Sequence, residues 1–231
     1  MFDDKKMTAL EMAPPAPGTM QKLADDLGWI RFTLPFRLDH INLFAFDTDA
    51  GWLLLDCGIK GAATAAQWQA LLDGPLAGRP VIGIIVSHYH ADHIGYAGAL
   101  ASQTGAPIYM GAVEYEQASW GLSQNDADYA AVMVDCYRQF GLADEHIDAA
   151  RNTGNYYRFL VGDLLEVTLI DDRHQFITKA GCWQVRFDAG HSPGHMSLTD
   201  SDRHLHICVD FLLPRISPNI SAKLRDLNAD M

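Results

Sequence analysis

The hydrophobic positions near the start of the chain fall in short runs rich in aromatic and β-branched residues, which predict strands. These runs cover residues 30–36, 40–46 and 52–58. The polar segment Asp-Thr-Asp-Ala-Gly between the last two predicts a hairpin turn. Residues 1–28 contain a proline-rich break and are interpreted as an N-terminal adaptor segment, with a short helix expected at 19–27.

The centre of the chain predicts a β-α-β unit. Residues 62–74 form a helix-like pattern that stops at Gly74-Pro75. The run at 79–87 is almost continuously apolar, which is typical of a central strand buried on both faces. A helix ending at Gly105 and a strand at 106–110 follow it. Polar residues between this strand and helix should lie at the strand's carboxyl end, where open α/β sheets place their sites.

The second half of the chain changes from helical to strand-like pattern. Residues 112–151 predict a helical insert, and strands return from residue 163 onward. The aromatic residues of the insert fit a lid over a site and fit packing on a sheet equally well. Strands and helices thus occur in two successive groups along the chain. This order favours an α+β layered sandwich with helices outside, as one domain over 29–231.

Composition and charge narrow the classes of function. With 48% hydrophobic and 20% charged residues the chain can bury a core, and a net charge of −12 argues against nucleic acid as a partner. We see neither a secretory signal nor an 18-residue apolar run, so we expect a cytoplasmic protein without a membrane partner. The four cysteines lack C-x-x-C spacing, and we expect reduced thiols.

The first candidate for a metal-binding segment is Ser-His-Tyr-His-Ala-Asp-His-Ile-Gly, residues 87–95. His88 and His90 are two residues apart at a strand end, so both side chains leave on one face. Asp92 and His93 follow where the chain must turn. Imidazoles and a carboxylate on a tight loop suit zinc or iron, although Asp92 is also a good N-cap for the next helix.

Two further groups of residues follow apolar strands. In Ala-Gly-His-Ser-Pro-Gly-His, His191 and His195 flank a Pro-Gly turn. Asp56 and Asp210 each come after an apolar run, where an acid is costly unless it is paired, hydrogen-bonded or bound to a metal. For Asp56 we weigh two roles, a carboxylate that orients a histidine and a turn-forming aspartate.

The combination of His-Tyr-His-Ala-Asp-His, Gly-His-Ser-Pro-Gly-His and a later acid resembles the metallo-β-lactamase-fold hydrolase superfamily, in particular its glyoxalase-II-like branch. The resemblance implies an αββα four-layer sandwich with a binuclear metal site. His88, His90 and His191 would hold one ion, Asp92 and His93 the second, and Asp210 would bridge both. His195 belongs to the motif without being a usual ligand.

The sequence departs from the family pattern at two places. Val209 stands before Asp210, where the family has glycine. The family also takes a last histidine from a loop far downstream, and no histidine follows Asp210. The resemblance therefore implies a shortened member that lacks the C-terminal strand–helix unit. His204 and His206 are conceivable substitutes, but their alternation at a strand start favours exposure.

Hydrolysis by a metal-bound hydroxide is the activity that the resemblance implies. Asp92 would orient the attacking hydroxide, and the substrate would be a small thioester, ester, lactone or β-lactam. Zinc is expected, as one or two ions, with iron or manganese as alternatives. Two other hypotheses stay open: an iron-dependent persulfide dioxygenase, and a metal-binding relative with little activity. Exposed edges left by a missing unit would favour a homo-oligomer.

Overall fold

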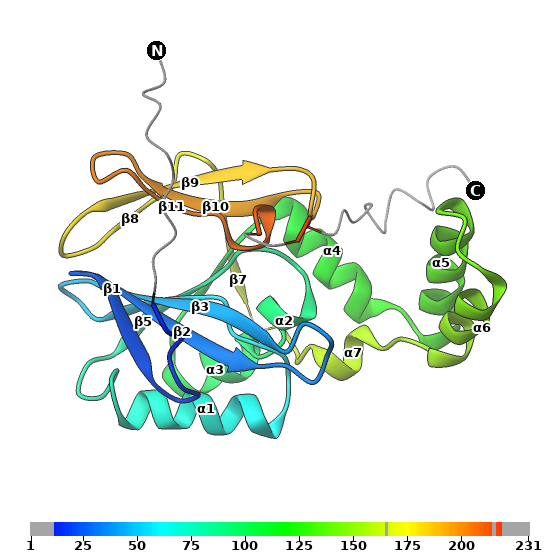
Figure 1. Cartoon of the computed structure of the whole chain (residues 1–231), viewed down its shortest axis with the longest axis horizontal. Helices are drawn as coiled ribbons and strands as arrows, with labels where there is room; N and C mark the ends of the chain where they lie inside the picture. Colours follow the sequence, from blue (N-terminus) through cyan, green and yellow to red (C-terminus); the bar gives the residue numbers. More distant parts are fainter. Residues whose placement is uncertain (1–11, 165, 214–215, 219–231) are drawn as a thin grey trace, which may run out of the picture.

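The computed structural model describes residues 12–164, 166–213 and 216–218, and in this part of the chain two β-sheets face each other (Figure 1). The larger sheet has the strand order β1-β2-β3-β4-β5-β6-β7, and the smaller has the order β11-β10-β9-β8. The strands are β1 Met20–Ala24, β2 Leu27–Thr33, β3 His40–Asp47, β4 Trp52–Leu55, β5 Val81–Val86, β6 Ile108–Gly111, β7 Val167–Ile170, β8 Gln175–Ile177, β9 Cys182–Asp188, β10 His195–Asp200 and β11 Leu205–Ile207. The predicted α+β fold with two sheets and helices is confirmed.

The helices lie outside the larger sheet and at one end of the molecule (Figure 1). They are α1 Ala62–Asp73, α2 Ala91–Ile94, α3 Ala97–Thr104, α4 Ala112–Ser123, α5 Asp126–Gln139, α6 Asp144–Thr153, α7 Tyr157–Leu160 and the 3₁₀ turn η1 Val209–Phe211. The helix expected up to Gly105 is split into α2 and α3, and Gly105 ends α3 with a φ of 74°. The residues predicted as a helical insert form α4, α5 and α6.

The larger sheet follows from the pattern of buried positions. β5 is buried at five of its six positions, because it lies between β4 and β6 with apolar layers on both faces. β3 and β4 pair antiparallel around the predicted hairpin turn, where the Thr48 N–H donates to the Gly51 carbonyl at 3.0 Å. β4 to β7 are parallel to one another. Their carboxyl ends therefore meet at one edge of the sheet.

The short helix predicted at 19–27 is wrong, because these residues form β1 and the start of β2. Met20 pairs with Ile30 and Ala24 with Leu27 across a tight turn. Tertiary pairing with β3 overrides the weak helical pattern here. The sheet thus continues across the expected boundary at residue 28, and residues 1–11 of the adaptor lie outside the described part.

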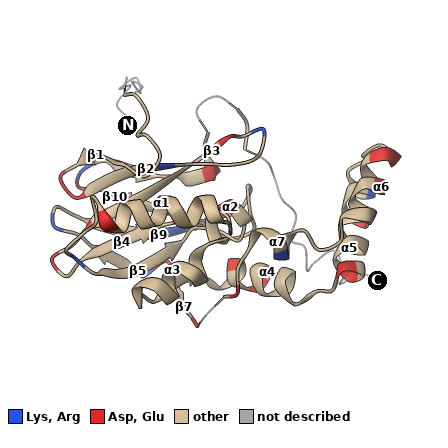
Figure 2. Ribbon diagram, turned by 90° about the horizontal axis from the view of Figure 1, so that it is seen from below, with Lys and Arg blue, Asp and Glu red and all other residues tan. Residues whose placement is uncertain are grey.

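Two apolar layers hold the sheets and helices together. One lies between the larger sheet and its helices and includes the fully buried Trp68 and Phe32, whose rings meet edge to face at 5.1 Å. The other lies between the sheets and includes Trp183 and Phe46, with ring centres 5.2 Å apart. Charged residues lie on turns and along the α5–α6 hairpin (Figure 2). In the described part of the chain, no helix is long and apolar enough to span a membrane.

Candidate metal centre

Three segments that are distant in sequence bring the predicted site residues together. The loop after β5 and the short helix α2 carry His88, His90 and His93. The loop after β9 carries His191, and η1, which follows β11, carries Asp210. Each segment follows a strand, so the sheets fix where these side chains start.

The first cluster consists of three imidazoles from two loops. The Nε2 atom of His88 lies 3.0 Å from Nδ1 of His90 and 3.1 Å from Nε2 of His191. The remaining pair, Nδ1 of His90 and Nε2 of His191, is 2.9 Å apart. Residues separated by about a hundred positions thus direct one nitrogen each at a common point.

Burial keeps two of these rings neutral. It lowers the pKa of His88 well below its usual range and lowers that of His90 to about 3, and neighbouring histidines add to both shifts. The Ser87 hydroxyl donates to Asp56 at 2.8 Å, so it accepts the Nδ1–H of His88 at 2.9 Å. The lone pair of His88 Nε2 therefore faces the cluster, as metal binding requires.

The second cluster is His93 with carboxylates around it. Its Nε2 lies 3.4 Å from an oxygen of Asp210 and 3.7 Å from one of Asp92. The same Asp210 oxygen is 3.6 Å from Nε2 of His191, so Asp210 stands between the two clusters. His88, His93 and Asp210 can offer ligand atoms within 4.8 Å of one another.

These residues fit a metal ion. The Nε2 of His93 is buried and makes no hydrogen bond within the described residues. Burial alone would lower the pKa of His93, but the charges of Asp210, Asp56 and Asp92 outweigh it and raise that pKa well above its usual range. The same negative charge attracts a cation. Imidazole nitrogens with carboxylate oxygens form a donor set suited to zinc or iron.

Asp56 fixes the base of the site from the end of β4. Its carboxylate accepts the backbone N–H of Ser87, the Ser87 hydroxyl and Nδ1–H of His93, each at 2.8 Å. The φ of Asp56 is 63°, a left-handed conformation that aspartate tolerates better than most residues. Asp56 therefore sets the tautomer and direction of His93, which directs Nε2 toward Asp210.

His195 packs against the cluster without a polar contact. It is fully buried, its ring centre lies 4.8 Å from that of His88, and neither ring nitrogen has a hydrogen-bond partner in the described part. Burial lowers the pKa of His195 to about 4, helped by the charge of His93. A neutral ring at this place supports His88 by contact.

Glu114 is the residue that the sequence interpretation missed. It lies in the first turn of α4, is fully buried, and accepts backbone N–H groups of Tyr89 at 2.9 Å and Gly194 at 2.5 Å. Burial raises its pKa even though both hydrogen bonds act to lower it. The available signal was an acid in the first turn of a helix directly after a buried strand.

The local structure around Asp92 and Asp210 differs from the expected pattern. Asp92 does not cap a helix, because α2 already begins at Ala91 with His90 at its N-cap. Asp210, which follows an apolar run in the sequence, lies in η1, and the strand β11 before it already ends at Ile207. Val209, which stands where the family has glycine, has a φ of 45°. This conformation suits glycine and is strained for a β-branched residue.

The remaining expectations concern exposed and reduced groups. His204 and His206 are exposed, as expected, and neither belongs to a ligand cluster found in the described residues. All four cysteines are free, and Cys57 and Cys136 are buried. Tyr129 of the insert belongs to the apolar layer beside the larger sheet, and Tyr115, Trp120 and Tyr137 pack against that layer. The rings of Trp120 and Tyr129 are 5.8 Å apart.

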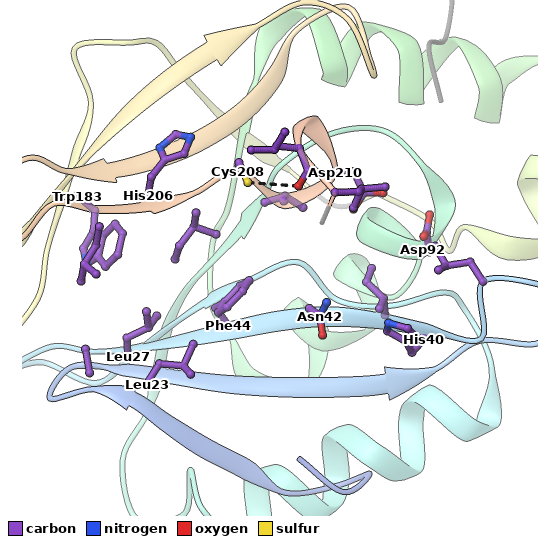
Figure 3. Close-up of a pocket in the computed structure, with 18 residues that line it drawn as sticks. Leu23, Leu27, His40, Asn42, Phe44, Asp92, Trp183, His206, Cys208 and Asp210 are labelled. Atoms are coloured by element: carbon purple, nitrogen blue, oxygen red, sulfur yellow. Dashed lines mark hydrogen bonds between the residues drawn. The ribbon is translucent and has the colours of Figure 1, made fainter. Parts of the chain in front are cut away.

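A pocket of about 420 Å³ adjoins the second cluster between β1–β3 and β11–η1 (Figure 3). Asp92 and His40 lie toward one end of it, and Leu27 and Trp183 toward the other (Figure 3). Its walls are mainly apolar, and no lysine or arginine lines it in the described part of the chain. The arrangement offers an apolar cleft that opens beside the carboxylates of the site.

Comparisons with known proteins agree with this geometry. A family model described as the metallo-beta-lactamase superfamily matches residues 37–230. A beta-lactamase domain protein from Burkholderia ambifaria is 29% identical, with a TM-score of 0.76 over 92% of this chain and 62% of that chain. A metallo-beta-lactamase family protein from Thermus thermophilus is 19% identical, with a TM-score of 0.70 over 88% of this chain and 65% of that chain.

Two other matches are to a metal-bound protein and to a curated enzyme. A structure of a protein in a di-iron-bound form is 21% identical, with a TM-score of 0.53 over 87% of this chain and 84% of that chain. Among curated proteins, exodeoxyribonuclease YycJ of Bacillus anthracis is 38% identical over 68 residues, which are 29% of this chain and 25% of that protein. The chain thus spans less than two thirds of the length of YycJ and of the first two structures.

Proposed function

The chain belongs to the metallo-beta-lactamase superfamily, and on that premise we propose that it is a metal-dependent hydrolase of small carbonyl compounds. The observation that carries the proposal is the convergence of His88, His90 and His191, whose nitrogens lie within 3.1 Å of one another. Three imidazole nitrogens directed at one point match the three-histidine donor set of a catalytic zinc site.

The two clusters would divide the metal ligands between them. His88, His90 and His191 would hold one ion, Asp92 and His93 a second, and Asp210 would contact both. When bound, the metal supplies Lewis acidity and lowers the pKa of water toward neutrality. Zinc is our first expectation, and iron is the alternative suggested by the di-iron-bound relative.

Asp92 is our candidate for the catalytic carboxylate. Its side chain is only partly buried, lines the cleft and lies 3.7 Å from Nε2 of His93. A carboxylate in that place can accept a hydrogen bond from the attacking water and hold it toward the cleft. Asp56 and Ser87 hold the histidines behind it, so the ligands need little rearrangement when a substrate arrives.

The cleft supports a carbonyl substrate with an apolar part, and a thioester is the form that the glyoxalase-II-like resemblance favours. The apolar walls can bury an acyl chain, at about 0.8 kcal/mol for each methylene. A nuclease is the second candidate, because of the relative named exodeoxyribonuclease YycJ. A net charge of −12 and a cleft without lysine or arginine among its described lining residues disfavour it.

The test is a substrate panel on protein loaded with zinc, iron or manganese. Acyl thioesters, aryl esters, lactones and linear DNA are assayed side by side with His88→Ala and Asp210→Ala as controls. We expect thioester hydrolysis that a chelator removes, zinc restores, and either substitution lowers roughly 100-fold or more. Absence of carbonyl hydrolysis by metal-loaded protein, or equal rates in the controls, contradicts the proposal.

A further inference from the structure

We propose that Glu114 is a positioning residue that holds the two histidine-bearing loops at the separation that a shared metal ion needs. The inference rests on the metal-dependent function proposed above. The side chain of Glu114 would bind neither metal nor substrate. It would act through the backbone of the two loops that carry the ligands.

The contacts of Glu114 join one loop to the other. Oε2 accepts the N–H of Tyr89 at 2.9 Å, and Tyr89 stands between His88 and His90. Oε1 accepts the N–H of Gly194 at 2.5 Å, in the turn that follows His191. One carboxylate thus connects two segments that are separated by about a hundred residues.

The carboxylate of Glu114 is offset by its contacts with the two ligand loops. Glu114 is fully buried and forms no ion pair with lysine or arginine in the described part of the chain. Burying an acid is costly unless it is hydrogen-bonded, and an apolar side chain here would leave the N–H groups of Tyr89 and Gly194 without this acceptor. What the carboxylate adds is two acceptor oxygens in a fixed relation, each facing one loop.

Neighbouring groups make the connection stiff. The Tyr157 hydroxyl donates to the Tyr89 carbonyl at 2.6 Å, so the backbone of Tyr89 is held through both its N–H and its C=O. A Cβ at Gly194 would lie 2.9 Å from the Cβ of Val113, which is closer than real contacts allow. Glycine therefore lets the second loop approach α4 closely enough to reach Glu114.

The test compares metal affinity in Glu114→Gln with the wild-type protein. Glutamine keeps the size of the side chain but has a single acceptor oxygen, and its amide N–H₂ would face a backbone donor. The apparent dissociation constants for Zn²⁺ and Co²⁺ are measured by competition with a chromophoric chelator, well below the unfolding temperature. We expect affinity to fall roughly 10–100-fold, as for other groups that orient metal ligands.

Asp26→Asn is the matched control. Asp26 is a buried carboxylate that also joins separate segments, because it binds Arg203 and Thr178. This variant should lower the unfolding temperature while metal affinity stays within about twofold of wild type, since its contacts share no partner with the histidines. If Glu114→Gln behaves in the same way, with lowered stability and unchanged affinity, the inference is overturned.

Two further outcomes are distinguishable. A wild-type chain that binds no metal overturns the proposed function and this inference with it, whereas tight wild-type binding with unchanged Glu114→Gln affinity overturns the inference alone.

If Glu114→Gln does not fold, Glu114→Asp and Tyr157→Phe take its place. The shorter carboxylate cannot reach both loops, and loss of the hydroxyl loosens one, so each should weaken Co²⁺ binding and shift its absorption spectrum. Wild-type values in both variants overturn the inference.

Discussion

At the scale of single residues, Val209 has a strained backbone conformation and stands directly before the candidate metal ligand Asp210. Its φ of 45° lies in the left-handed region, where a β-branched side chain meets the backbone. The next residue is Asp210, which stands between the two ligand clusters. The strain therefore sits next to the carboxylate that would join two metal ions. Packing of Val209 on the layer between the sheets offsets part of this strain.

Replacing Val209 by glycine and by alanine separates strain from packing. Both changes remove the apolar contacts, but only glycine relieves the left-handed backbone. We expect Val209→Gly to be more stable than Val209→Ala by about 1 kcal/mol in urea unfolding. At most sites a glycine variant is less stable than the alanine variant. If Val209→Gly is the less stable of the two here, the claim of a strained backbone at Val209 is contradicted.

Single residues also show which parts of the candidate site can be predicted from the sequence and which cannot. The residues expected as ligands do converge, because each lies in a segment that follows a strand and the strand ends meet at the edges of the sheets. Glu114 could not be assigned, because its partners Tyr89 and Gly194 are 25 and 80 positions away. Hydrogen bonds to backbone groups leave no residue-type signal at the partner position.

At the scale of elements, α3 packs unusually close to the segment after α7. A Cβ at Gly98 would lie 1.9 Å from the carbonyl oxygen of Asp163, and one at Gly95 would lie 2.4 Å from that of Leu160. The N–H of Gly162 donates to the Gly95 carbonyl at 2.9 Å. These contacts seat α2 and α3, and α2 carries His93. Two glycines thus hold the helical side of the site in place.

Gly98→Ala tests this contact. Helix propensity alone would make alanine more stable by about 1 kcal/mol, but the clash with backbone atoms cannot be relieved by a side-chain movement. We therefore expect a loss of about 3 kcal/mol in the free energy of unfolding. Gly61→Ala, with no atom within 4 Å of the added Cβ, should cost less than about 1 kcal/mol. Equal effects in the two variants would contradict the close packing.

The elements that sequence patterns predicted well are those with one dominant signal. The apolar run of β5, the helix α1 and the hairpin between β3 and β4 were all expected, because local pattern and tertiary packing agree there. The segment at 19–27 was wrongly predicted as a helix. Its polar residues alternate weakly, and its strand state depends on pairing with β3 by way of β2. A short stretch of sequence does not reveal pairing of this kind, because the partner strand lies outside that stretch.

At the scale of the whole molecule, a polar network joins the two sheets. Asp26, in the turn after β1, accepts hydrogen bonds from Arg203 at 2.5 and 3.0 Å and also from Thr178. Arg203 also binds Asp200 at 2.8 Å, and its guanidinium lies 5.2 Å from the Trp183 ring. Burial would raise the pKa of Asp26, but the hydrogen bonds from Arg203 and Thr178 outweigh it and lower that pKa.

This network predicts a loss of stability in acid. A lowered folded-state pKa means that the unfolded chain binds protons first, so the stabilisation is complete above about pH 5 and falls as the pH drops further. Asp26→Asn should cost about 3 kcal/mol near neutral pH and flatten the decline between about pH 5 and about pH 3. Urea unfolding across that range measures both effects. The exposed neighbour Asp25, changed to Asn, should leave the decline nearly as in wild type, and an equal effect there would contradict the account.

The central claim is that loops separated by about a hundred residues bind one cation, and zinc X-ray absorption spectroscopy tests it most directly. Protein loaded with one equivalent of zinc should show three imidazole nitrogens at about 2.0–2.1 Å. His191→Ala should leave two, with water or a carboxylate oxygen in the vacated position. An unchanged number of imidazole ligands in His191→Ala, or fewer than two in the wild-type protein, would contradict the account.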